Sequence, residues 1–360
     1  MIGERVLITG SSGYIGTSIG AYLQTKGYDV IGVDTGFFRE NIFYEAPTVP
    51  TRWMDVRDMC STDFEGVDAV VHLAGISNDP VGRMPPEKLY DPTRSYSHEI
   101  ARICKDRGIR FVFASSCSVY GVGDESFVDE DSVPKPQTPY SLNKLQVEQD
   151  LVQLAGETFS PIALRFATIY GPSARIRFDV VINMLCGMAV TQGQVVLNSD
   201  GQAWRPNLHI SDACEAVHRA ISSHYDSGSL LILNVGSDEA NRQILDLANI
   251  IAKHAGGCPV KFLTDNPDLD KTGLVGDRKI HEGRDSRTYR VAFDRVSEVF
   301  PGYKCQMKVE DGIAQLINQL HSLNFDANMF KRRGFYRLQH LEDLLDRGTL
   351  SQELRWQSED

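Results

Sequence analysis

Three side chains have the chemical types and the spacing needed to move a proton together with a hydride. Tyr140 and Lys144 are four residues apart, so they share one face of the helix that the pattern predicts over residues 139–154. An ammonium at that distance lowers the pKa of the phenol, which is ~10 in an unperturbed tyrosine and too high for a base at neutral pH. The hydroxyl of Ser116 can hold a substrate oxygen while Tyr140 removes its proton and a hydride leaves for a nicotinamide. This interpretation requires a dinucleotide site, because a lone YxxxK spacing also arises by chance.

A glycine-spaced turn near the N-terminus has the features of such a dinucleotide site. Residues 6–16, VLITGSSGYIG, run from an apolar strand through a turn directly into a helix. Gly10 permits the tight turn, Gly13 lets backbone amides approach a diphosphate, and Gly16 lets the helix pack closely on the strand. The alternative is a plain glycine turn followed by a solvated acid. The residues predicted to bind the cofactor here are Gly10, Ser12, Gly13, Tyr14, Ile15 and Gly16.

Two acidic residues extend the predicted site toward an adenosine. Asp34 ends the second apolar strand, where a carboxylate can hold both ribose hydroxyls of NAD and would repel the extra phosphate of NADP. Asp55, followed by Val56, lies at the expected end of a third strand, where it could meet the adenine. Asp55 could equally well be the cap of a short helix that follows, and the sequence leaves both interpretations open.

Strands and helices alternate along the first half of the chain, and this alternation predicts an α/β fold with a Rossmann-type, doubly wound parallel sheet. The expected strands cover residues 5–9, 30–33, 69–73, 110–114 and 161–166. Beyond Tyr170 the pattern changes to short segments and isolated arginines, as expected of a smaller lobe.

We therefore predict three parts. They are an NAD-binding domain over 1–172, to which later strands return from 205–236, a mainly substrate-binding lobe over 173–320, and a helical C-terminal extension over 321–360. The extension is expected to pack against the body of the protein, with a subunit contact as the alternative.

Composition narrows the classes of partner. The 360 residues are 42% hydrophobic and 24% charged, as in ordinary globular proteins, and carry a formal net charge of -11. No surplus of cations exists to neutralise a phosphate backbone, which argues against nucleic acid as a partner. Seven cysteines without CxxC pairs predict reduced thiols in the cytoplasm and no metal site. No apolar stretch is long enough to span a bilayer, so we expect neither a membrane anchor nor a signal peptide.

Taken together, several motifs resemble those of the extended short-chain dehydrogenase/reductase family, the NAD-dependent nucleotide-sugar epimerases and dehydratases. The resemblance runs from residue 5 to about residue 311. It rests on TGSSGYIG (9–16), HLAG (72–75), SSCSVYG (115–121), YSLNK (140–144), LRF with YGP (164–166, 170–172) and the segment from Asp200 through Arg205 to Asp212.

The resemblance implies roles for individual residues. Ser116, Tyr140 and Lys144 would be catalytic, and Arg205 would face the diphosphate of a nucleotide sugar. The cofactor site would further include Asp34, Asp55, Val56, Leu73, Ala74 and Gly75. Weaker candidates for the substrate diphosphate are Arg175, Arg177 and Arg287, for which surface ion pairs are the alternative. Val196 would contact the nucleobase, although a strand packed in the core would have the same sequence.

Departures from the family pattern limit what the resemblance implies. Thr168 replaces the asparagine of the family's LRxxNxYGP motif. Thr93, next to Pro92, replaces the family's asparagine in the helix before the catalytic strand, so substrate placement is expected to be unusual. Relatives that dehydrate carry an Asp-Glu pair where this chain has Cys117 and Ser118, so elimination lacks its acid and base. Cys117 and Ser118 are retained as possible accessory residues, with a small buried residue as the preferred interpretation of Cys117.

The favoured reaction is epimerisation of a nucleotide sugar through a transient 4-keto sugar, with NAD regenerated in each cycle. A dehydrogenase that releases the keto sugar is the first alternative and a dehydratase the second. A non-catalytic dinucleotide-binding protein belongs to a different class, and the intact set of Ser116, Tyr140 and Lys144 argues against it. As in relatives, the helices over 86–107 and 139–154 are expected to pair in a homodimer.

Overall fold

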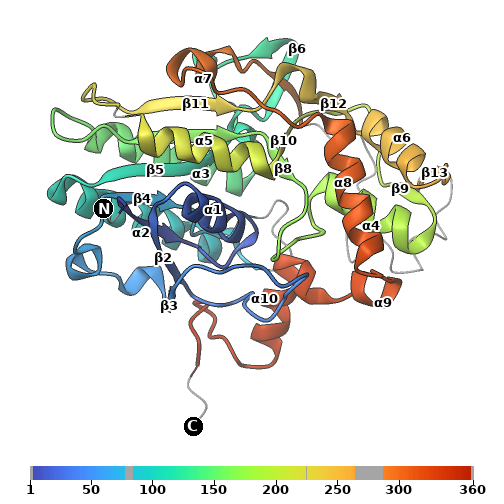
Figure 1. The fold of residues 1–360 in the computed structure, drawn as a ribbon, viewed down its shortest axis with the longest axis horizontal. Helices are drawn as coiled ribbons and strands as arrows, with labels where there is room; N and C mark the ends of the chain where they lie inside the picture. The colour runs from blue at the N-terminus through green and yellow to red at the C-terminus, as the bar shows by residue number, and fades with distance from the viewer. Residues whose placement is uncertain (1–2, 78–83, 224, 264–286, 358–360) are drawn as a thin grey trace.

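A seven-stranded parallel sheet forms the centre of the molecule (Figure 1). The computed structural model describes residues 3–77, 84–223, 225–263 and 287–357. The strands follow the order β11-β7-β5-β4-β1-β2-β3, and each neighbouring pair is parallel. Their bounds are β1 (Arg5–Thr9), β2 (Asp29–Asp34), β3 (Thr51–Trp53), β4 (Ala69–His72), β5 (Arg110–Ser116), β7 (Ile162–Phe166) and β11 (Leu231–Val235). The predicted fold class is therefore confirmed.

The register places the ends of these strands at one edge of the sheet. Thr9 pairs with Val33 on one side and with His72 on the other. Because parallel strands all end at the same edge, the turn after β1, Asp34 of β2 and Ser116 of β5 converge there. The strand order reverses between β1 and β4, and a crevice at such a reversal is where doubly wound sheets bind their ligands.

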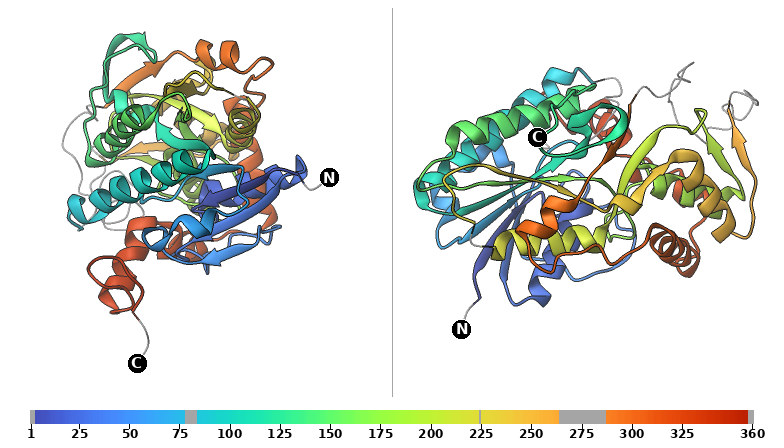
Figure 2. Two further views of the ribbon diagram at one scale, coloured as in Figure 1. Left: turned by 90° about the vertical axis from the view of Figure 1, so that its left-hand side faces the viewer. Right: turned by 90° about the horizontal axis from the view of Figure 1, so that it is seen from above.

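Helices cover both faces of the sheet (Figure 2). Alternate residues of β1 point into two separate cores: Val6 and Ile8 join the core that includes α1 and α5, and Leu7 joins the core that includes α2 and α3. Strands buried on both faces are expected to be almost continuously apolar, as β1 and β4 are. The helices are α1 (Tyr14–Thr25), α2 (Pro86–Arg107), α3 (Pro139–Leu154) and α5 (Ile210–Ser222).

Short sheets and helices form the second lobe beside the carboxyl edge. β10 (Trp204–His209) pairs with β8 (Thr168–Tyr170) and β12 (Asn241–Gln243), so it stays in this lobe, whereas β11 joins the central sheet. The remaining strand pairs are β9 (Val195–Leu197) with β13 (Val260–Phe262), and β6 (Val122–Val128) with β14 (Thr288–Val291). The lobe's helices are α4 (Val181–Gln192), α6 (Ile244–His254) and α8 (Val309–Ser322), whereas α7 (Asp294–Val299) packs against β11 of the central sheet (Figure 1).

The C-terminal extension, residues 323–357, returns beneath β2 and β3 of the central sheet (Figure 1). It contains α9 (Ala327–Phe330) and α10 (Arg337–Asp346) and ends in a bridge between Leu350 and Trp356. Its root is held by an aromatic cluster whose neighbouring ring centroids lie 5.1–6.3 Å apart. That cluster consists of Phe43, Phe178, Phe325, Phe330 and Phe335. The division into three parts stays a prediction.

Among the residues that the structure describes, no helix combines the length and the apolar composition needed to cross a bilayer.

Candidate active site

A cavity of about 400 Å³ opens at the carboxyl edge of the sheet. Its lining comes from the turn after β1, the ends of β2, β4 and β5, helices α2 and α3, the second lobe and the C-terminal extension. The cavity lies at the reversal of strand order, the position that the topology favours for a ligand.

The glycine turn forms a cradle that side chains would fill. Gly10 has a φ of +76°, and a Cβ there would lie 2.9 Å from the amide nitrogen of Ala74. A Cβ at Gly16 would lie 2.1 Å from the carbonyl oxygen of Gly10. Gly13 caps α1 without a side-chain hydrogen bond, so the first amides of this helix remain available to an anion. The cradle therefore fits the diphosphate of a dinucleotide.

Most of the residues predicted for this turn line the cavity, namely Gly10, Gly13, Tyr14, Ile15 and Gly16. Ser12 is not part of the lining; its amide instead donates to Asp34 Oδ2 at 2.9 Å. The Tyr14 hydroxyl donates to the carbonyl of Gly171 at 2.8 Å, which ties the turn to the second lobe.

Asp34 lines the cavity and is held by backbone amides. Besides the bond from Ser12, its Oδ1 accepts from the amide of Gly36 at 2.7 Å. Burial raises the pKa of Asp34, and these two hydrogen bonds act in the opposite direction. The carboxyl group is thus fixed in place at the end of β2, where the ribose of a dinucleotide is expected.

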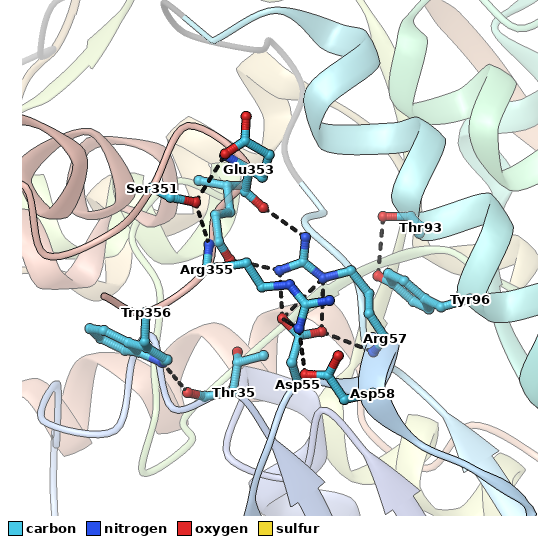
Figure 3. A network of polar contacts seen from close by, with 11 residues as sticks. Thr35, Asp55, Arg57, Asp58, Thr93, Tyr96, Ser351, Glu353, Arg355 and Trp356 are labelled. Atoms are coloured by element: carbon cyan, nitrogen blue, oxygen red, sulfur yellow. Dashed lines mark hydrogen bonds and ion pairs between the residues drawn. The ribbon is translucent and has the colours of Figure 1, made fainter. Parts of the chain in front are cut away.

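Asp55 caps a short helix and lines the cavity, and its contact with an adenine stays a prediction. Asp55 caps the short 3₁₀ helix Val56–Asp58 by accepting from the amide of Arg57, and it also lines the cavity together with Val56. Burial favours a raised pKa of Asp55, but the hydrogen bonds and charge of Arg57 outweigh burial and lower it. Figure 3 shows Asp55 enclosed by the guanidinium groups of Arg57 and Arg355.

The segment after β4 lies directly beside the glycine turn, and Leu73, Ala74 and Gly75 all line the cavity. His72, immediately before them, is fully buried and bonds Thr9 Oγ1 at 2.7 Å and Ser97 Oγ at 2.9 Å. Burial lowers the pKa of His72 to about 3, so its ring is neutral and structural.

Ser116, Tyr140 and Lys144 all face the same cavity. Lys144 Nζ donates to the carbonyl of Ala114 at 2.7 Å and lies 5.8 Å from the centroid of the Tyr140 ring. Burial lowers the pKa of Lys144 to about 8, while the charge of Glu148 acts in the opposite direction. The structure thus brings together the three residues predicted to be catalytic.

Local sequence explains why this end of α3 is well defined. Pro139 occupies the first turn, where its missing N–H is tolerated, and Thr138 accepts from the amide of Ser141 at 3.2 Å. The Ser141 hydroxyl in turn accepts from the amide of Thr138 at 3.1 Å, which completes a capping box. This cap sets the start of the helix and so the position of Tyr140 in its first turn.

A buried ion pair that sequence reasoning missed lies behind Ser116. Glu148 and Arg165 are 2% and 3% exposed and join at 2.6 Å. Ser115 donates to Glu148 at 2.5 Å, and Arg165 donates to the Tyr120 hydroxyl at 2.9 Å. An arginine inside the apolar strand β7 was the available signal, because a buried cation requires an acidic partner.

Three candidate site residues do not line the cavity, and for Cys117 this agrees with the preferred interpretation of a small buried residue. Cys117 is 1% exposed and donates to the Arg165 carbonyl at 3.0 Å; it does not line the cavity, and burial raises the pKa of its thiol. It is a buried structural residue because the 3₁₀ helix 117–120 turns it into the core. Val196 is 2% exposed within the core, so the packing alternative holds for β9. Arg175 is also outside the lining, and its carbonyl accepts from Arg337.

The other substrate candidates do reach the cavity, which is lined by Ser118, Thr168, Arg177, Arg205 and Arg287. Arg177 is ion-paired with Asp179 and donates to Ser77 Oγ at 2.8 Å. Arg205 lies with its guanidinium 5.7 Å from the Tyr289 ring centroid. The Ser118 hydroxyl is buried without a hydrogen-bond partner among the described residues, as expected of a group that meets a ligand.

Sequence reasoning missed the part of the lining that comes from distant segments. It includes Phe37, Arg57, Arg337, Glu353 and Leu354. The residues of the extension lie some 300 positions from the glycine turn, and no motif spacing links them to it.

Comparisons with known proteins agree with this architecture. A family model described as "NAD dependent epimerase/dehydratase family" matches residues 6–236. An "Uncharacterized UDP-glucose epimerase YtcB" of Bacillus subtilis is 28% identical over 270 residues, which cover 70% of this chain and 82% of that protein. The UDP-glucose 4-epimerase of Bacillus subtilis is 26% identical over 299 residues, covering 73% and 86% of the two chains.

Among solved structures, a UDP-glucuronic acid 4-epimerase from Bacillus cereus, in complex with UDP-glucuronic acid and NAD, superposes with a TM-score of 0.72 at 21% identity. The match covers 89% of this chain and 99% of the other, so the fold is shared almost throughout that protein.

Proposed function

This chain belongs to the NAD-dependent epimerase/dehydratase family, and on that premise we propose that it is a nucleotide-sugar epimerase that acts through a transient 4-keto sugar. The observation that carries the proposal is the convergence of Ser116, Tyr140 and Lys144 on a cavity that Arg177 and Arg205 also line. One end of the cavity thus holds groups for proton transfer, and cations suited to a diphosphate line it as well.

In the proposed reaction, the Tyr140 phenolate takes the proton of the sugar hydroxyl as the carbonyl forms. NAD, when bound, accepts the hydride from the carbon atom and supplies it again later. Ser116 donates a hydrogen bond to the carbonyl oxygen of the keto sugar. The ammonium of Lys144 stabilises the phenolate electrostatically, because it lies 5.8 Å from the Tyr140 ring centroid in a site shielded from water.

Inversion follows when the keto sugar rotates and receives the hydride on its other face. Tyr140 then returns its proton to the oxygen, so the cycle is redox-neutral and needs no second substrate. The unpaired Ser118 hydroxyl supports a hydrogen bond to the sugar. We propose no elimination of water, because Cys117 and Ser118 replace the acid and base and the Cys117 thiol is bonded to a backbone carbonyl.

The experiment that tests this function uses a panel of UDP-, GDP-, dTDP- and CDP-sugars, beginning with UDP-glucose because relatives carry that name. Absorbance of reduced nicotinamide is followed, and the sugars are analysed afterwards. An inverted sugar without net NADH supports the epimerase. Accumulation of NADH with a keto sugar would replace it by a dehydrogenase, and a lack of turnover with NAD bound would favour a binding protein.

We further propose a homodimer in the cytoplasm. Leu142 and Val152 expose 46% and 53% of their surface on α3, which supports pairing of α2 and α3 with their symmetry mates. The seven cysteines are all free, as expected in a reducing compartment. A sedimentation mass equal to one chain would exclude the dimer.

A further inference from the structure

The C-terminal extension is built into the cofactor cleft and not merely attached beside it. Its α10 and its last turn contribute Leu338, Leu341, Leu350 and Leu354 to an apolar cluster. The cluster also holds residues from the start of α2, and Tyr140 packs against it. Together with the phenylalanine cluster at its root, this packing fixes the extension along its length.

Polar contacts join the tip of the extension to the predicted adenosine end of the cleft (Figure 3). Arg57 donates to the carbonyls of Glu353 at 2.7 Å and Leu354 at 2.8 Å while it also binds Asp55. From the other side, Arg355 forms ion pairs with Asp58 and Asp55. The extension and the Asp55 loop therefore share one charged network.

Trp356 makes a second connection, to the loop after β2. Its indole Nε1 donates to the carbonyl of Thr35 at 2.6 Å, and its ring centroid lies 5.6 Å from that of Phe37. Thr35 directly follows Asp34, and both line the cavity. Trp356 thus bonds the loop next to the carboxylate expected to hold a ribose.

The backbone conformation of Leu354 also indicates that the extension is fixed against the cavity. Leu354 adopts a φ of 54°, a conformation that a leucine keeps only where its surroundings fix it. This turn places Leu354 in the apolar cluster and in the lining of the cavity while its carbonyl meets Arg57.

Arg337 brings a buried cation to the same cavity. It is 5% exposed, donates to the carbonyl of Arg175 at 2.6 Å, and stacks 4.3 Å from the Phe38 ring centroid. The cost of burying this charge lowers the pKa of Arg337 to about 9. A diphosphate in the cleft would offset that cost.

We propose that the C-terminal extension is part of the cofactor site, in which Leu354, the backbone of Glu353 and the Arg337 guanidinium enclose the adenosine half and retain NAD through repeated turnovers. This rests on the proposed function, because an epimerase uses the same NAD for both hydride transfers. The three residues lie outside the range 6–236 that the family model matches, so the family does not assign them.

The test compares the release of NAD from three variants with that from the parent protein. One variant ends at Asp346, the second carries Arg355→Ala with Trp356→Ala, and the control carries Arg333→Ala. The control removes the ion pair with Asp343, which lies within the extension but outside the cavity lining. Release is measured without sugar, by displacement of bound NAD with a fluorescent etheno analogue. We expect release to accelerate about tenfold or more in the first two variants, and to be unchanged in the control.

A truncated protein that is folded by circular dichroism yet releases NAD at the parent rate would overturn the proposal. Should truncation prevent folding, the release rate of the double variant tests the proposal instead, because both of its residues lie at the surface. The Arg355 side chain is 39% exposed and Trp356 is 43% exposed. Release is independent of turnover. If the parent protein proves not to be an epimerase but the two variants still release NAD faster than it does, the proposed function is rejected and the cofactor-site assignment stays intact.

Discussion

At the proposed catalytic end of the cleft, the Ser115 hydroxyl donates to Glu148, which pairs with Arg165, and these two side chains are 2% and 3% exposed. At the adenosine end, the pair of Arg57 with Asp55 is 20% and 13% exposed, and that of Arg355 with Asp58 is 39% and 56% exposed. Water and salt reach the second set of charges but not the first. A buried pair cannot be broken without leaving an uncompensated charge, whereas exposed pairs contribute little and exchange easily.

We infer from this difference that the proposed catalytic end of the cleft is held rigidly, whereas the proposed adenosine end can open. Proton transfer depends on positions of a few tenths of an ångström, and Ser116, which we propose to be catalytic, directly follows Ser115, whose hydroxyl donates to this buried pair. The adenosine end needs only to hold a ligand, and its closure can be altered without loss of the core. Each of the following experiments perturbs one end of the cleft and is expected to leave the other end unchanged.

The largest expected effect is on the chemistry itself. Tyr140→Phe keeps the ring but removes the proton relay, so turnover should fall by about 10³-fold while NAD stays bound. Steady-state rates and the NAD content of the purified protein check this. A matched control is Tyr22→Phe, whose hydroxyl bonds Glu215 away from the cavity and whose loss should leave the rate unchanged. Undiminished turnover in Tyr140→Phe would contradict the mechanism.

The next effect concerns the support of the catalytic end. Arg165→Met leaves Glu148 as an unpaired buried carboxylate and should lower the free energy of unfolding by about 3–5 kcal/mol. Arg52→Met removes a half-exposed ion pair with Asp63 and should cost less than about 1 kcal/mol. Urea unfolding measures both. Equal losses of unfolding free energy in the two variants would contradict the inference that the buried pair matters more to stability than the half-exposed one.

A pH titration sharpens the same comparison. Because the pKa of Lys144 is about 8, its ammonium loses its proton as the pH rises through that value, and turnover should fall on the alkaline side. The native state then binds fewer protons than the unfolded chain up to the usual lysine pKa of ~10.4, so stability should rise over that range.

Activity and stability should therefore change in opposite directions above pH ~8. Lys144→Arg keeps its charge above pH ~8, so the fall in turnover should occur at a higher pH in this variant. If the fall occurs at the same pH as in the parent protein, another group causes it.

At the adenosine end, Arg57→Met removes the cation that binds Asp55 and two carbonyls of the extension. We expect NAD affinity to fall about tenfold. The free energy of unfolding should change by at most about 1–2 kcal/mol, because the pair remains within reach of water. Isothermal titration with NAD and urea unfolding test the two parts separately, and a loss of stability as large as that of Arg165→Met would remove the distinction between the two ends.

The smallest effect is that of salt. Raising the salt from 0.1 M to 1 M shortens the screening length from about 10 Å to about 3 Å. Release of NAD should accelerate a few-fold, while the stability contributed by the buried pair is unaffected. Stopped-flow displacement of NAD at the two salt concentrations measures this, with Arg57→Met as the variant in which the salt effect should be smaller.

The sequence predicted the catalytic end well and the adenosine end only in part. Gly10 follows β1, while Asp34 and Ser116 are the last residues of β2 and β5, and the common edge of a parallel sheet brings them together whatever the loops do. For Val196 and Cys117 the sequence left a ligand contact and core packing both open, because apolar residues in strands and short helices have the same pattern whether they face a ligand or the core.

The extension could not have been placed from sequence. Its apolar spacing indicates a helix that buries one face, but not the surface on which that face rests. The contact is determined by tertiary packing of Leu338 and Leu341 against α2 and by hydrogen bonds to the backbone carbonyls of Glu353 and Leu354. Every residue type has a backbone carbonyl, so contacts made by carbonyls cannot be recognised in the sequence.

Because residues 323–357 follow the sheet and the glycine turn in the chain, the cleft that some of them line is completed late in synthesis. The ribosome releases residues in chain order, so the sheet and the glycine turn can form before residues 323–357 emerge. A dinucleotide then meets an open cleft, and the bond from Trp356 to Thr35 is among the last to form.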